Sequence, residues 1–187
     1  MIVNGVEKLT CITPIREVTR DGGTIRVEPL HNFPVVSDLV VDLAPLYTRM
    51  EEIGAASVLP VDVLPDAGGG IGHGTPPATL DDEPVLRLVD CIECGLCISA
   101  CPVQATDPDY LGPAVIAAAH LQNIAENREL CALLEGDEGV WRCHSAFECT
   151  AVCPSNVEPA WRIMDTRRNV VRVRLHQLVT KNQGERR

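Results

Sequence analysis

Cysteines in two short runs are the residues of this chain whose spacing indicates chemistry. The first run, residues 91–102, has the spacing C-x2-C-x2-C-x3-C-P. In this pattern the first three thiolates ligate one iron–sulfur cluster, and the fourth ligates a different cluster. A second run is therefore required, and residues 143–154 supply it, ending like the first in Cys-Pro. Exchange of the fourth cysteines predicts two sites, one with Cys91, Cys94, Cys97 and Cys153, the other with Cys101, Cys143 and Cys149.

The second run departs from the first at one position. Ala146 stands where the pattern requires its middle cysteine, three residues after Cys143. Alanine cannot ligate iron, so the second site has three thiolates for a cluster that needs four. We expect a [3Fe–4S] cluster there beside a complete [4Fe–4S] cluster, with different reduction potentials, because cluster type and net charge set the potential. The alternative is a labile [4Fe–4S] cluster with water or hydroxide on its fourth iron.

Two other uses of cysteine fit the spacing less well. Zinc takes four ligands, usually from two separated C-x2-C pairs, whereas three cysteines here fall within seven residues. Disulfides form in oxidising compartments; no signal peptide precedes the runs, and nine cysteines leave one unpaired. A structural zinc-binding module remains the alternative from a different class. Cys131 lies outside both runs and is expected in the core.

The elements before the cysteine runs begin with short strands. Asn4-Gly5 between apolar residues predicts a hairpin turn. Residues 8–13 are expected to continue as a strand, and residues 24–29 alternate between apolar and polar side chains, as a half-buried strand does. A β segment of this size cannot close a core alone, so it must pack on other elements.

Helices and a loop are expected next. Residues 39–43 and 46–53 are predicted as short helical pieces. Residues 54–83 are rich in glycine and proline and predict a surface loop; their glycines lack the Lys-Ser/Thr of a phosphate-binding loop. Residues 83–90 are expected to make two helical turns into the first cysteine run.

Two helices are predicted around and after the second half of the site. Gly112-Pro113 starts a helix whose residues 114–121 are apolar nearly all round, which indicates burial. Residues 155–158 have the spacing of a capping box and are expected to start the final helix. Its apolar positions are Ala160, Met164, Val171, Leu175 and Leu178, while Arg167, Arg168, Arg172 and Arg174 are expected to project elsewhere.

Charge is unevenly distributed along the chain. The formal net charge is −10, but residues 159–187 hold 8 Lys and Arg against 2 Asp and Glu. This basic end is either a solvated helix face or a surface that meets an acidic partner or a membrane. No apolar run approaches the roughly 20 residues of a membrane-spanning helix, so we expect a soluble protein or one held at a membrane by partners.

The chain resembles the iron–sulfur subunit of succinate dehydrogenase and fumarate reductase. Besides the two cysteine runs, the resemblance rests on Val3-Asn-Gly, Leu9-Thr-Cys11, Ile25-Arg-Val-Glu-Pro-Leu, Phe33-Pro-Val, residues 38–42, Gly112-Pro-Ala and Gly139-Val-Trp-Arg-Cys143. It implies an α+β fold: residues 1–38 as a remnant of a plant-type [2Fe–2S] ferredoxin domain, and residues 39–187 as a mostly α-helical dicluster ferredoxin domain. It also places the [4Fe–4S] and [3Fe–4S] ligands at the positions assigned above.

Two departures from the family pattern affect these expectations. Of the four cysteines that hold the family's [2Fe–2S] cluster, only the last, Cys11, is present. A [2Fe–2S] cluster is therefore expected only if the missing cysteines are supplied, and a start assigned too far downstream or a truncated gene is expected. The tryptophan that many succinate-oxidising members carry after the first Cys-Pro is also missing, since residues 103–107 read Val-Gln-Ala-Thr-Asp.

The function predicted from the resemblance is electron relay as one subunit of succinate dehydrogenase or fumarate reductase (quinone). The expected partners are an FAD-containing flavoprotein, a membrane anchor and a quinone, at the cytoplasmic face of the cell membrane, with no nucleic acid. Pro102, His144 and Ala146 are expected to line the quinone pocket, although His144 fits equally well as a hydrogen-bonding neighbour of cluster sulfur. The alternative within electron transfer is a heterodisulfide-reductase or glycolate-oxidase type subunit with two complete cubes, which the alanine at position 146 disfavours.

Overall fold

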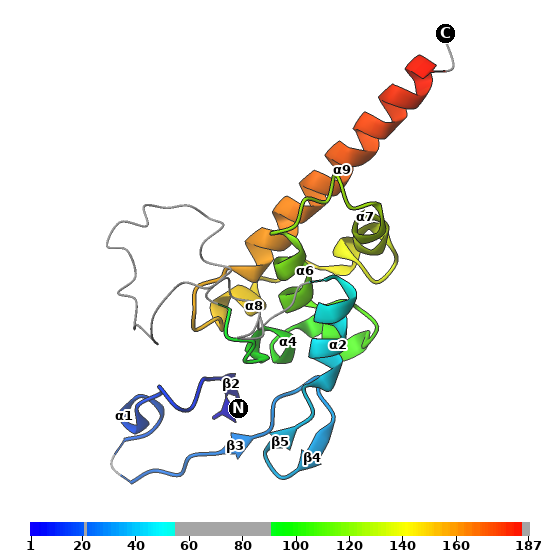
Figure 1. Ribbon diagram of the computed structural model, residues 1–187. Helices are drawn as coiled ribbons and strands as arrows, with labels where there is room; N and C mark the ends of the chain where they lie inside the picture. The colour runs from blue at the N-terminus through cyan, green and yellow to red at the C-terminus, as the bar shows by residue number, and fades with distance from the viewer. Residues whose placement is uncertain (21, 55–90, 185–187) are drawn as a thin grey trace, which may run out of the picture.

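A small β part at the N-terminus is followed by a helical body (Figure 1). The computed structural model describes residues 1–20, 22–54 and 91–184, the last four of these by their backbone only. The predicted loop over residues 54–83, apart from Gly54, and the predicted helical turns over 83–90 lie outside the described residues. The architecture confirms the α+β fold class expected from the sequence.

Three very short strands form the first sheet. β1 (Ile2–Val3) pairs antiparallel with β2 (Val6–Glu7) on one side and with β3 (Val27–Glu28) on the other. The predicted hairpin turn is confirmed, because Asn4 and Gly5 have φ values of 51° and 81°. Both values lie in the left-handed region that a two-residue hairpin turn requires, and asparagine and glycine are the residues that adopt it most readily.

Two sequence predictions in this part are wrong. Residues 8–13, expected as a strand, form turns that lead into the short helix α1 (Ile15–Val18). Residues 39–43, expected as a helix, instead contain β5 (Val40–Val41), which pairs antiparallel with β4 (Val35–Ser37). The valines of this second hairpin are β-branched and favour strands, and pairing across the hairpin outweighs the helical pattern.

The helical body surrounds one core. Its elements are α2 (Ala44–Glu52), α4 (Leu96–Ser99), α5 (Pro102–Thr106), α6 (Pro113–Ala119), α7 (Arg128–Glu135), the 3-10 helix η2 (Val140–Arg142), α8 (Glu148–Ala151) and α9 (Pro159–Gly184). The helix predicted from Gly112-Pro113 is confirmed as α6, and it is fully buried at Val115 and Ile116. α6 packs against α9, α2 and α4, so it forms the centre of the body.

The final helix has two differently placed halves. In its first half Ala160, Ile163 and Val170 are at most 1% exposed. Its second half extends away from the body (Figure 1), and Leu175 and Leu178 are 57% and 63% exposed. Among the described residues, no helix is both long and apolar enough to span a bilayer.

The start of this helix corrects another prediction. α9 begins at Pro159 rather than after Ser155, and Asn156 and Glu158 have φ values of 52° and 56°. A capping box over residues 155–158 is therefore not formed. Proline is favoured in the first turn of a helix because its missing N–H has no partner to lose there.

Polar contacts fasten the β part to the first cysteine run. The Asn32 side-chain amide donates to the carbonyl oxygens of Ile98 and Cys101, at 2.7 and 3.2 Å. The His31 N–H donates to Ser99 Oγ at 2.9 Å, and that hydroxyl donates to a carboxylate oxygen of Glu7 at 3.0 Å. The N-terminal part thereby fixes α4, the helix that carries Cys97 of the first run.

Candidate iron–sulfur sites

The loop of the first cysteine run is bent at two positions. Glu93 and Gly95 have φ values of 52° and 75°, and α4 begins at the next residue, Leu96. A side chain at position 95 would also put its Cβ 3.0 Å from the Phe33 ring. Glycine therefore serves both the left-handed backbone and the close approach of Phe33. The bends turn the chain back on itself between successive cysteines.

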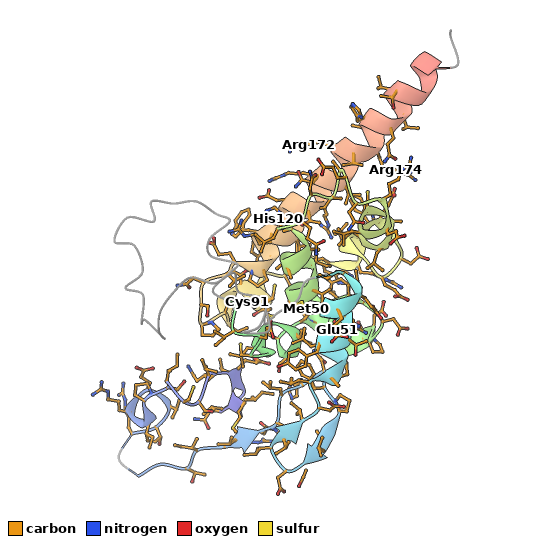
Figure 2. The ribbon with its side chains drawn as sticks, viewed as in Figure 1. Met50, Glu51, Cys91, His120, Arg172 and Arg174 are labelled. Carbon is orange, nitrogen blue, oxygen red and sulfur yellow. The ribbon has the colours of Figure 1, made fainter. Side chains whose placement is uncertain are left out.

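One cavity brings together the four cysteines predicted for the first site. Its walls include Cys91, Cys94, Cys97 and Cys153. Cys91 and Met50, which both line this cavity, are labelled in Figure 2. Burial raises the pKa of the Cys97 thiol well above its usual range, and the nearby sulfurs of the other three and of Cys149 raise it further. The four cysteines, each partly buried, thus line one cavity.

A second, smaller cavity holds the other predicted set. It is lined by Cys101, Cys143 and Cys149, together with Ala146. Burial raises the pKa of Cys149 to about 12, with Cys101 and Cys143 as the next causes. Cys97 lies on α4 and Cys149 on α8, and these two helices pack against each other, so the two cavities are neighbours.

Backbone N–H groups point at the cysteine sulfurs in both cavities. The N–H groups of Val157 and Ser145 donate to the sulfurs of Cys153 and Cys143, each at 3.4 Å. Further backbone donors are Glu93 to Cys91, Leu96 to Cys94, Val103 and Gln104 to Cys101, and Thr150 to Cys149. Hydrogen bonds to sulfur are one of the ways a protein stabilises and tunes an iron–sulfur cluster. The residues present therefore fit this cofactor.

The arrangement does not suit a single metal ion. Within the ranges that the structure describes, no three His, Cys, Asp or Glu side chains are grouped so that they could hold one ion. A structural zinc site needs four ligands around one centre. The cysteines instead line two cavities, four in the first and three in the second.

The second loop repeats the backbone of the first. Ser145 and Phe147 have φ values of 58° and 66°, the same two left-handed positions as in the first loop, and α8 follows directly. Ala146 consequently takes the place that Cys94 takes in the first loop. A bulky residue such as Phe147 rarely adopts this conformation; its ring packs edge-on against Trp161, with centroids 5.0 Å apart.

Arg167 of α9 donates hydrogen bonds to the second loop. Its guanidinium donates to the Val140 carbonyl oxygen at 2.8 Å, to the Cys143 carbonyl oxygen and to Ser145 Oγ at 3.3 Å. It also lies over the Trp141 ring, 5.9 Å from the centroid. The expectation that this arginine projects away is therefore wrong. The sequence contains little indication that Arg167 contacts the second loop, since nothing in it distinguishes this residue from the other arginines of α9.

Tyr110 is a residue that the sequence analysis missed. It is 1% exposed and lines the second cavity together with Cys143. Burial raises the pKa of Tyr110, and the sulfurs of Cys143 and Cys101 raise it further. A tyrosine that follows Asp107-Pro108-Asp109 is a weak signal, because its buried hydroxyl needs a partner that the sequence does not identify.

The remaining predicted residues are distributed as follows. Pro102 and His144 line the second cavity with Ala146, so the three residues expected at the quinone pocket lie together; their role there stays a prediction. Cys11 is exposed on the N-terminal part. Cys131 is 5% exposed within α7, which confirms its place in the core.

The fold and the two cavities define an iron–sulfur protein with a pair of adjacent cluster sites. Comparison with known families agrees: residues 87–157 match the model of the 4Fe-4S dicluster domain, and residues 1–48 match that of a 2Fe-2S iron-sulfur cluster binding domain. Both are iron–sulfur domains, which confirms the class of cofactor predicted from the cysteines.

The relatives are more specific. The chain is 38% identical over 167 residues to the fumarate reductase iron-sulfur subunit of Mycobacterium tuberculosis (strain CDC 1551 / Oshkosh), covering 87% of this chain and 65% of that protein. It is 37% identical over 177 residues to the corresponding subunit of Haemophilus influenzae, covering 86% and 65%. It is 33% identical over 169 residues to the mitochondrial succinate dehydrogenase [ubiquinone] iron-sulfur subunit of Dictyostelium discoideum, covering 85% and 57%. The chain thus spans less than two thirds of the length of these relatives.

A solved structure shares the fold. A chain of the Mycobacterium smegmatis Sdh1 complex in the apo form aligns with a TM-score of 0.63 at 24% identity, covering 90% of this chain and 70% of that one. The resemblance predicted from the motifs is therefore confirmed. In sequence this chain is similar to the iron–sulfur subunits of fumarate reductase and succinate dehydrogenase.

Proposed function

We propose that this chain is the electron-relay subunit of a succinate dehydrogenase or fumarate reductase. The observation that supports this most strongly is the adjacency of two cysteine-lined cavities, whose helices α4 and α8 pack against each other. Iron–sulfur clusters, when bound, take up and release single electrons. The chain's own residues hold sulfur in place, direct backbone N–H groups at it and exclude water from it.

The two sites are proposed to differ in kind. Cys91, Cys94, Cys97 and Cys153 would hold a [4Fe–4S] cluster, and Cys101, Cys143 and Cys149 a [3Fe–4S] cluster. Support for the second assignment comes from Ala146. The backbone on either side of it has the same conformation as around Cys94, but its side chain is a methyl group in place of a thiolate. The same alanine disfavours the heterodisulfide-reductase or glycolate-oxidase type of subunit, whose second cube needs a fourth thiolate. In this proposal residues 39–187 form the dicluster domain.

The partners are proposed from the relatives. A flavoprotein subunit carrying FAD would exchange electrons with this chain at one end of the relay. A membrane quinone, held with an anchor subunit, would exchange them at the other end. We place the quinone beside Pro102, His144 and Ala146, which line the second cavity. The chain would then sit peripherally at the cytoplasmic face of the membrane. A [2Fe–2S] cluster would use Cys11 only together with cysteines supplied from elsewhere.

Single cysteine substitutions test the proposal, because the ligand exchange makes a crossed prediction. The unmodified chain, reconstituted anaerobically with ferrous iron and sulfide, should bind about seven irons and no zinc. Cys153→Ser, in the second run, should impair the first centre, and Cys101→Ser, in the first run, should impair the second. Cys131→Ser, in the core of α7, is the matched control and should retain both.

The contrary results are equally distinct. Loss of the second centre in Cys153→Ser, with the first intact, would mean that each run serves its own cluster. Binding of zinc with no iron would end the electron-relay proposal.

A further inference from the structure

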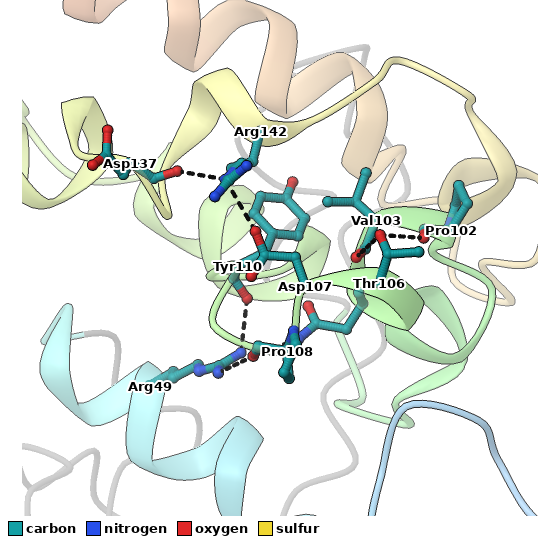
Figure 3. A network of polar contacts seen from close by, with 10 residues as sticks. Arg49, Pro102, Val103, Thr106, Asp107, Pro108, Tyr110, Asp137 and Arg142 are labelled. Carbon is teal, nitrogen blue, oxygen red and sulfur yellow. Dashed lines mark hydrogen bonds and ion pairs between the residues drawn. The ribbon is translucent and has the colours of Figure 1, made fainter.

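Tyr110 is held rigidly between α5 and α6. Its backbone carbonyl oxygen accepts a hydrogen bond from the Arg49 guanidinium at 2.8 Å, and the same guanidinium donates to the Pro108 carbonyl oxygen at 2.5 Å (Figure 3). Asp107, three residues earlier, is ion-paired with Arg142 at 3.0 Å. These contacts from α2 and η2 fix the loop before α6, and with it the direction of the tyrosine ring.

The Tyr110 hydroxyl meets a predicted cluster ligand. The buried side chain lines the second cavity together with Cys143. At neutral pH a tyrosine keeps its proton and donates it, whereas a ligating thiolate only accepts. The sulfur of Cys143 already accepts a hydrogen bond, at 3.4 Å, from the Ser145 N–H. The Tyr110 hydroxyl is the side-chain donor that the same cavity offers to this sulfur.

We propose that Tyr110 tunes the second centre, donating a hydrogen bond to Cys143 that raises its reduction potential. The inference rests on the proposed function, because it requires a redox cluster at that site. Reduction adds negative charge that is shared with the ligating sulfurs, so a donor aimed at one of them favours the reduced form. The backbone donors act in the same way, but substitution does not remove them. Tyr110 therefore acts on the reduction potential of the second centre through Cys143, and its hydroxyl oxygen is the atom that a substitution must remove to test this.

The test is Tyr110→Phe, which deletes that oxygen and keeps the ring. In an EPR-monitored redox titration of the cluster-loaded full chain, the second centre should become about tenfold harder to reduce, a shift of about 59 mV for one electron. The potential of the first centre and the iron content should stay unchanged. Tyr47→Phe is the matched control: this other tyrosine is 40% exposed on α2 and should shift neither centre.

A second measurement detects the donated proton itself. Electron–nuclear double resonance of the unmodified chain should show a proton coupled to the second centre that exchanges in D₂O, and Tyr110→Phe should lose this coupling. An unchanged midpoint potential in Tyr110→Phe would overturn the inference. So would an equal shift of both centres or a loss of iron, which would indicate a packing role. If the unmodified chain forms no second centre, the proposed function fails, and the inference falls with it.

Discussion

Replacing Arg167 by methionine should weaken the second site more than any neighbouring substitution. Arg167 donates two hydrogen bonds to the second loop, at Cys143 and Ser145, and a third to the carbonyl of Val140 in η2, a residue with no exposed surface. A hydrogen bond from a charged group contributes about 1.5–3 kcal/mol, and a buried carbonyl left unpaired costs about 1–3 kcal/mol. Because the arginine is half-buried and water can replace some of these bonds, we expect a total loss of about 2–4 kcal/mol.

The assay is a urea titration of the cluster-loaded chain, followed by visible absorbance. With an m-value of about 2 kcal/mol/M, the expected loss lowers the midpoint by about 1–2 M. Arg168→Met is the matched control. Among the residues that the structure describes, Arg168 pairs only with Asp165, at 2.5 Å on the surface, so its loss should cost less than about 0.5 kcal/mol. Arg167→Lys keeps the charge but loses the planar fork, so it should fall between the two. Equal urea midpoints for Arg167→Met and Arg168→Met would refute the claim that the hydrogen bonds of Arg167 stabilise the second site.

Three further predictions follow from the same geometry. Ala146→Cys should raise the iron content from about seven to about eight per chain and lower the potential of the second centre, because the backbone there already matches that around Cys94; iron analysis with a redox titration would detect a failure to bind the extra iron. Gly95→Ala should cost about 1–3 kcal/mol more than Gly5→Ala in urea titrations, because both positions have positive φ but only Gly95 lies against Phe33, and equal losses would contradict the packing argument. The pKa of His120 is lowered by burial and by Arg162, partly offset by Asp165, so the unfolded chain binds this proton more readily than the folded chain does. The free energy of unfolding should therefore fall as the pH drops below about 6.5. This fall should be smaller in His120→Gln than in His176→Gln, the control, because His176 is exposed.

The sequence predicted the site better than it predicted the elements around it. Cysteine spacing predicts the ligand exchange, because the fourth cysteine of a run of fixed length can reach only a neighbouring cluster. In the structure Cys153 lines the cavity of Cys91, and Cys101 lines that of Cys149. The buried helix α6 and the Asn4-Gly5 turn also follow from local chemistry. Residues 39–43 were misassigned because short apolar runs fit a helix and a strand equally well.

Other features depend on contacts that no local pattern contains. Arg167 and Arg168 are adjacent and chemically identical, yet one meets the carbonyls of the second loop and the other lies exposed. Which of them faces the site is set by where α9 begins, and Pro159 moved that start from the predicted capping box. Tyr110 lines the second cavity from a loop whose carbonyls accept hydrogen bonds from Arg49, which is distant in sequence.

The central claim is that a complete site and a site lacking one thiolate lie side by side. EPR spectroscopy of the oxidised, cluster-loaded chain tests it most directly, since an oxidised three-iron cluster is paramagnetic and an oxidised four-iron cube of this type is not. We predict a three-iron signal that integrates to about one spin per chain, with a four-iron signal appearing only on reduction. An oxidised protein that contains its full iron but gives no three-iron signal would contradict the account.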